Sequence, residues 1–152
     1  MSPLPIVTGA DNPILRRKNE RVPKVTKEIK KLLRDMADSM TKEEGAGIAA
    51  PQVGVNVRVC IAVIDEKARA LINPDITWKS DELTLDEEGC LSLPGLQVTV
   101  PRAREITVKY LDLQGKEQER RLADFNARVV QHEVDHLDGV LISDYAPVGT
   151  TT

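Results

Sequence analysis

The sequence lacks several features that would assign it to other classes of protein. Its longest apolar run, Val59 to Ile64, is far too short to cross a membrane. The first residues contain neither the basic segment nor the apolar stretch of a secretory signal. A net charge of −3 over 152 residues gives no general attraction to nucleic acid. Only two cysteines are present and no segment repeats, so we expect one cytoplasmic domain over residues 1–152.

The apolar pattern predicts two helices separated by a series of strands. One helix follows Thr26, a suitable N-cap, and ends before Gly45; the other covers residues 124–137, with Gly139 just beyond its end. The other expected elements are a turn at 11–13, a loop of small residues over 45–54, strands over 57–65, 70–73, 76–79, 96–100, 105–113 and 117–122, and a hairpin turn at 114–115. Because helices and strands do not alternate, the pattern indicates an α+β fold with antiparallel sheets.

Histidine occurs only twice, and both residues lie in His132-Glu133-Val134-Asp135-His136. Residues four apart share one face of a helix, so both imidazoles can reach one metal ion, while Glu133 can act on a water molecule beside it. Phe125 and Val129 continue the same stripe, which places the histidines on the side that faces the core. The alternative is a pair of hydrogen-bonded core histidines beside a surface glutamate, and it requires polar partners for two buried rings.

Two histidines on one helix need a third ligand from elsewhere, and Cys90 in Glu88-Gly89-Cys90-Leu91-Ser92 is a candidate. The glycine before it permits an unusual backbone angle or a close approach. The alternative for Cys90 is a small core residue, which is how we interpret Cys60 in its alternating strand.

A third segment, 45–52, is rich in small residues and ends at Gln52. It either allows another backbone to approach closely or forms a plain tight turn.

Together these three segments resemble the peptide deformylase family. The motifs of that family read G-x-G-x-A-A-x-Q, E-G-C-L-S and H-E-x-x-H, and all three are present in that order at 45–52, 88–92 and 132–136. The resemblance covers nearly the whole chain. It implies antiparallel sheets packed around the central helix that carries the third motif. The implied activity is removal of the N-formyl group from the N-terminal formyl-methionine of newly made polypeptides, with release of formate.

The resemblance also implies a catalytic metal site. Cys90, His132 and His136 would bind one divalent ion, with water in the fourth position. Fe(II) is the expected native metal, and zinc, nickel or cobalt are possible substitutes. Glu133 would accept a proton from the attacking water and pass it to the leaving amine.

Further residues take their expected roles from the same resemblance. The side chain of Gln52 and the backbone N–H of Leu91 would stabilise the oxyanion. Asp135 would pair with Arg102, the alternative being a solvated surface aspartate. The residues expected to line the substrate groove and the methionine pocket are Gly47, Glu88, Gly89, Phe125 and Val129.

Two departures from the family pattern concern partners. Many members end in a further helix with basic residues, whereas no Lys or Arg follows Leu137 here, so we expect weak or no docking on ribosomes. Gln97 lies in the stretch where some members have an arginine that binds substrate. The expected partners are formyl-methionine peptides and nascent chains, and neither membranes nor a specific nucleic acid.

Two other functions fit parts of the pattern. An H-E-x-x-H endopeptidase would need a ligand after the helix, where no histidine follows His136 and only Asp138 and Asp144 are acidic. A structural zinc domain would need a fourth protein ligand, and Cys60 has no C-x-x-C spacing. Formate release from a formyl-methionine peptide distinguishes the three functions.

Overall fold

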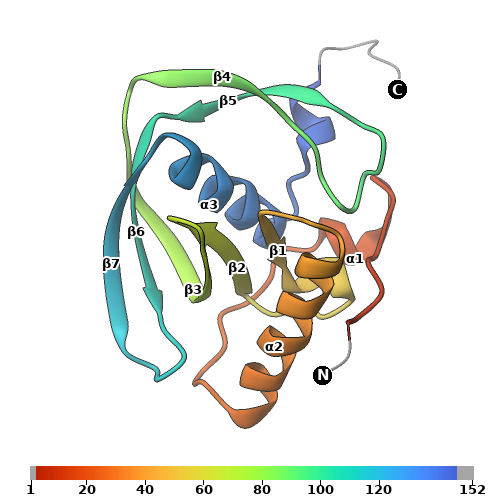
Figure 1. Ribbon diagram of the computed structural model, residues 1–152, viewed down its shortest axis with the longest axis vertical. Coiled ribbons are helices and arrows are strands. Elements are labelled where there is room, and N and C mark those ends of the chain that lie inside the picture. The colour runs from red at the N-terminus through yellow and green to blue at the C-terminus, as the bar shows by residue number, and fades with distance from the viewer. Residues whose placement is uncertain (1–2, 147–152) are drawn as a thin grey trace.

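Two antiparallel sheets make up the β structure of the computed structural model, which describes residues 3–146 (Figure 1). The larger sheet has the strand order β1-β2-β3-β6-β7, and the smaller pairs β4 with β5. The strands are β1 (Gly47–Ala49), β2 (Val59–Ile64), β3 (Lys67–Lys79), β4 (Leu83–Glu88), β5 (Val98–Ala103), β6 (Glu105–Leu111) and β7 (Glu117–Ala123). The helices are α1 (Pro13–Arg16), α2 (Lys27–Lys42), α3 (Asp124–Leu137) and the 3-10 turns η1 (Ala50–Val53) and η2 (Ile142–Tyr145).

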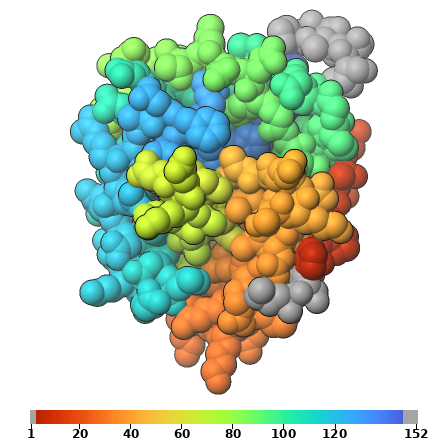
Figure 2. Space-filling view, in the orientation of Figure 1, coloured from red at the N-terminus to blue at the C-terminus, as the bar shows by residue number. Residues whose placement is uncertain are grey.

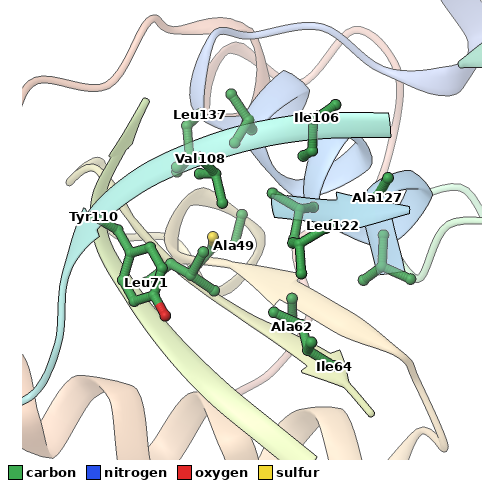
Figure 3. Close-up of a cluster of buried hydrophobic side chains, with 14 of the residues drawn as sticks. Ala49, Ala62, Ile64, Leu71, Ile106, Val108, Tyr110, Leu122, Ala127 and Leu137 are labelled. Carbon is green, nitrogen blue, oxygen red and sulfur yellow. The ribbon is translucent and has the colours of Figure 1, made fainter. Parts of the chain in front are cut away.

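Helix α3 lies between the two sheets (Figure 1). It follows β7 directly and packs on β1, β2 and β5. Ala127 and Leu137 of the helix join buried side chains of the large sheet, such as Val108 and Leu122, in one apolar cluster (Figure 3). Burial of each large apolar side chain stabilises the fold by about 1.5–3 kcal/mol. The core therefore fixes the helix that carries the two histidines.

Helix α2 packs against β1 and β2 with its apolar side. Thr26 caps it as expected, since its hydroxyl accepts a hydrogen bond from Ile29 N at 3.2 Å. Leu33 and Met36 are buried among residues of these strands, whereas the lysines of the opposite side are exposed. The predicted bounds of both long helices are confirmed, as is Gly139, which has a φ of 76° just beyond α3.

The predicted α+β class with antiparallel sheets is confirmed, but three predicted elements are wrong in detail. The expected loop over 45–54 contains β1 and η1. The separate strands over 70–73 and 76–79 are one strand, β3. The strand passes Asn73 and Pro74 through a register shift, at which Asn73 has a φ of 53°. The Asn73 side chain holds this bulge by hydrogen bonds to the N–H and carbonyl of Val22.

Strand β4 was not predicted, although Leu83, Thr84, Leu85 and Asp86 alternate between apolar and polar residues. Leu83 and Leu85 are 59% and 71% exposed, while Glu88 at its end is buried. The leucines of this strand therefore do not face the core. The turn expected at 11–13 leads into α1, and the hairpin at 114–115 is confirmed. Among the described residues, no helix combines the length and apolar character needed to span a bilayer.

Candidate active site and metal centre

Three side chains that could bind a metal ion meet between α3 and the segment after β4. The ligand atoms of Cys90, His132 and His136 all lie within 4.8 Å of one another. The Cys90 Sγ is 3.3 Å from Nε2 of His136. One turn of α3 sets the two imidazoles side by side, with ring centroids 5.1 Å apart. The structure therefore brings together the three residues that the family resemblance implies as metal ligands.

His132 is oriented by Glu88. Its Nδ1 is 2.8 Å from Oε1 of Glu88, which leaves Nε2 as the ring nitrogen available to a metal. Burial disfavours the charged ring, but hydrogen bonds with Cys90 and Glu88 raise the pKa of His132 to about 10. Without a metal, the ring therefore holds a proton that a bound cation must displace.

His136 has a different environment. The residue is 1% exposed, and burial, together with the charge of His132, holds its pKa well below the usual range. The ring is therefore neutral, the form in which histidine binds metals. Its Nδ1 has no hydrogen-bond partner among residues 3–146.

Glu88 is the centre of a buried ionic network. Its Oε1 accepts a hydrogen bond from Nη2 of Arg102 at 2.9 Å, and its Oε2 accepts from Nε of Arg102 at 2.9 Å and from Nη1 of Arg128 at 2.6 Å. Burial opposes the charge, yet the hydrogen bonds with His132 and Arg102 lower the pKa of Glu88 to about 2. Glu88 is thus a fixed anion behind the His132 ring.

Arg102 extends this network to a second carboxylate on α3, that of Asp135. Its Nη1 donates to Asp135 at 2.5 Å, and the hydroxyl of Tyr145 donates to the same carboxylate oxygen at 2.7 Å. The predicted pairing of Asp135 with Arg102 is confirmed. The alternative of a solvated aspartate is wrong, because the Asp135 side chain is only 23% exposed.

Glu133 faces the cavity beside the metal ligands and is 4% exposed, so the alternative of a surface glutamate is wrong. Burial raises its pKa to about 7. Its Oε1 has no hydrogen-bond partner among the described residues. A buried carboxylate with an unused acceptor is suited to accept a proton from a ligand in the cavity.

Position 47, in the small-residue segment, has room only for a glycine. A Cβ placed on Gly47 would lie 2.5 Å from Oε2 of Glu133 and 2.9 Å from its Cδ. The Glu133 side chain therefore lies against the backbone of β1 at Gly47, and the approach of another backbone to this segment stays a prediction.

Gly47→Ala is expected to displace the Glu133 carboxylate and leave the metal ligands in place. Because a misplacement of about 1 Å can cost about 10²-fold in rate, turnover should fall by about that factor. The measurement is activity alongside metal content and thermal unfolding of the variant. Full activity in a folded, metal-loaded variant would show that Glu133 tolerates the shift.

Gln52 and Leu91 both line the cavity. The Gln52 amide is fixed, since its Oε1 accepts from Ala49 N at 2.9 Å and its Nε2 donates to Ser92 Oγ at 3.2 Å. That Nε2 also lies 3.9 Å from the Cys90 Sγ. Within residues 3–146, no acceptor lies in hydrogen-bonding range of the Leu91 N–H. Both groups can therefore donate to an oxygen near the metal ligands.

The cavity has a volume of about 440 Å³. Figure 2 shows the surface hollowed between the green strands β4 and β5, the blue helix α3 and the segment that follows α2. Its lining includes every residue predicted to contact substrate: Gly47, Glu88, Gly89, Phe125 and Val129. Phe125 does not face the core as its stripe suggested. It is 60% exposed and lies in the first turn of α3.

Sequence reasoning missed Arg128, Ser92 and Tyr145. Arg128 precedes His132 by four residues, so its place on the same stripe was a usable signal. Tyr145 and Ser92 gave no such signal, because their contacts join segments far apart in the chain.

The acidic residues available to the alternative functions are occupied elsewhere. Asp138 pairs with Arg58 at 2.8 Å, and Asp144 pairs with Arg16 at 2.7 Å. Cys60 is fully buried in the apolar core, as predicted. Neither the third ligand of an endopeptidase nor the fourth ligand of a structural zinc site joins the cluster within the described part of the chain.

Comparisons with known proteins agree with this geometry. The polypeptide deformylase family profile matches residues 3–150. The peptide deformylase of Pseudothermotoga lettingae is 44% identical over 136 residues, which cover 90% of this chain and 79% of that protein. The peptide deformylase of Dictyoglomus thermophilum is 47% identical over 135 residues, covering 89% and 88% of the two chains. The crystal structure of peptide deformylase from Thermotoga maritima superposes with a TM-score of 0.93 at 38% identity, covering 97% of this chain and 99% of that one. The chain belongs to the polypeptide deformylase family, whose members are metal-dependent enzymes that remove the N-formyl group from nascent polypeptides.

Proposed function

We propose that this chain hydrolyses the formyl amide of N-terminal formyl-methionine at a metal held by Cys90, His132 and His136. The observation that carries the proposal is the meeting of three ligand atoms within 4.8 Å beside a cavity lined by Glu133. One thiolate and two imidazoles suit borderline divalent ions such as Fe(II), Co(II), Ni(II) and Zn(II). Three protein ligands leave an open position, as in catalytic sites. When bound, the metal supplies Lewis-acid activation of water and of the formyl oxygen.

The protein residues account for the proton and the oxyanion. Glu133 accepts the proton of the attacking water, whose oxygen adds to the formyl carbon. Nε2 of Gln52 and the N–H of Leu91 donate hydrogen bonds to the oxygen that becomes negative in the tetrahedral stage. Glu133 then delivers the proton to the leaving nitrogen as the C–N bond breaks. The products are formate and a free amino terminus.

The substrate side chain is proposed to enter the cavity between α3 and β4. Val129 and Phe125 supply apolar contacts for methionine, and the backbone near Gly47 and Gly89 leaves room for the peptide. Gln97 also lines the cavity, so this position offers an amide rather than an arginine to the peptide.

The proposed partners are formyl-methionine peptides and nascent chains in the cytoplasm. Residues 138–152 contain no Lys or Arg, so we propose that this segment supplies little or no docking on ribosomes. Residues 147–152 of that segment lie outside the described residues.

The decisive test is formate release from a formyl-methionyl tripeptide by the purified, metal-loaded chain. An acetyl-methionyl tripeptide is the matched control, because its extra methyl group lies at the reacting carbon. Formate without internal cleavage is expected. Cleavage between residues would instead indicate an endopeptidase, and loss of the fold on metal removal without any hydrolysis would indicate a structural site.

The native metal is proposed to be Fe(II), and this predicts that oxygen inactivates the native form. The iron form should lose activity faster than the nickel form, because an open position beside a thiolate gives oxygen access to an oxidisable ion and its sulfur ligand. The measurement is the half-life of formate release for each form in aerated and anaerobic buffer. Equal half-lives in air would contradict the prediction.

A further inference from the structure

Arg128 is a buried cation in the wall of the substrate cavity. It belongs to α3, is 6% exposed and lines the cavity with Glu88 and His132. Its Nη1 donates to Glu88 at 2.6 Å and to the Val100 carbonyl at 2.9 Å. Its Nη2 donates to the carbonyl of Thr84 at 2.8 Å and to its hydroxyl at 3.1 Å. The guanidinium therefore joins α3 to both strands of the small sheet.

Only an arginine can make this set of contacts. Four acceptors surround two terminal nitrogens held in one plane, and a lysine ammonium carries three donors on a single atom. The burial cost of the cation is offset by Glu88, which is itself buried. Such a group is not needed to fill the wall of an apolar pocket, since an apolar side chain of similar size would do so without desolvating a charge.

Arg128 is linked to the proposed metal ligand His132 through Glu88. Arg128 and His132 are one turn apart on α3, and both contact the same carboxylate from β4. Each oxygen of Glu88 has two partners: Arg102 and His132 at Oε1, and Arg102 and Arg128 at Oε2. Loss of Arg128 leaves Oε2 with one donor and frees the end of β4 from the helix on that side. The carboxylate that aims His132 is then less well fixed.

We propose that Arg128 is a positioning residue that locks Glu88 between α3 and the small sheet, and thereby fixes both the His132 ring and the width of the cavity. The proposal rests on the proposed function, because it assigns His132 to the metal. The hydrogen bonds of Arg128 go to Glu88, Val100 and Thr84 and not to Cys90, His132 or His136. Its effect passes through Glu88.

The test compares Arg128→Met and Arg128→Lys with the parent chain, all loaded with Co(II). Two readouts do not depend on turnover: the rate at which a chelator removes the metal, and the visible absorption bands of the bound Co(II). Partners behind metal-ligating histidines typically alter metal affinity by about 10–100-fold. Arg128 contacts Glu88 rather than His132, so we expect an effect at the lower end of this range. Metal release from Arg128→Met should be about 10-fold faster, and its absorption bands should shift. The rate of metal release from Arg128→Lys should lie between the rates for Arg128→Met and for the parent chain.

Arg58→Met is the matched control. Arg58 also joins the main body to α3, through Asp138 at 2.8 Å, but it does not contact Glu88. Arg58→Met should leave metal release and absorption unchanged, whatever its effect on stability.

Thr84→Val is a second variant, informative if Arg128→Met does not fold. It keeps the charges of Arg128 and Glu88 and removes only the hydroxyl that Arg128 contacts. It should speed metal release by a smaller factor.

Substrate preference gives an independent readout of cavity width. With the wall less well fixed, Arg128→Met should discriminate less between formyl-methionine and the bulkier formyl-phenylalanine, seen as a smaller ratio of kcat/KM values. Parent-like metal release, absorption and preference in folded Arg128 variants would overturn the inference while formate release by the parent still supports the proposed function. A parent chain that binds metal but releases no formate would instead overturn the proposed function.

Discussion

Glu133→Ala is expected to keep its metal and to lose about 10²–10⁴-fold in turnover, the usual contribution of a general acid–base group. Glu133 follows His132 by one residue, so its side chain points about 100° away from the ligand around the helix. It therefore faces the cavity without belonging to the three-ligand cluster. Removal of the carboxylate takes away the proton acceptor and leaves every ligand atom in place.

The measurements are metal per chain by elemental analysis and formate release from the same preparation. Glu133→Gln preserves the size of the side chain and removes only its basicity, so it should be impaired to a similar degree. Glu28→Ala, on the exposed side of α2, controls for purification and should behave as the parent chain. Near-normal turnover of metal-loaded Glu133→Ala would exclude the proposed proton transfer.

Cys90→Ala is expected to abolish both metal binding and activity, and His132→Ala should do the same. Each change reduces three ligands to two, and two ligands do not hold a divalent ion against water at ordinary metal concentrations. Cys60→Ala is the matched control, because Cys60 is buried in the apolar core and belongs to no group of ligands. It should retain one metal per chain at some cost in stability.

Metal uptake by the parent chain should also depend on pH in a defined direction. Despite burial, the hydrogen bonds with Cys90 and Glu88 raise the pKa of His132 to about 10 in the metal-free chain, so a proton competes with the metal throughout the neutral range. Uptake should therefore be weaker at pH 6 than at pH 8, and each binding event should release protons. Full metal content in Cys90→Ala, or pH-independent uptake, would contradict the assigned ligand set.

Features set by neighbouring residues could be predicted from the sequence. The bounds of α2 and α3 follow from apolar spacing and terminal residues such as Thr26 and Gly139. The placing of His132 and His136 on one face depends only on the pitch of a helix. The identity of the third ligand came from the family's motifs, and the structure places Cys90 beside these histidines.

What only the tertiary structure decided involves contacts between residues far apart in the chain. Pairing with β5 made a strand of residues 83–88 although its two leucines are exposed, and a bulge at Asn73 joins into β3 the two strands that the sequence predicted separately. The shared carboxylate of Glu88, bound by Arg102, Arg128 and His132, unites β4, β5 and α3. Periodicity in the sequence indicates which face of a helix or strand is apolar. It does not indicate which charged residues from distant parts of the chain will contact that helix or strand. The ligands could therefore be named from the sequence and its family likeness, whereas the network that orients them required the packed fold.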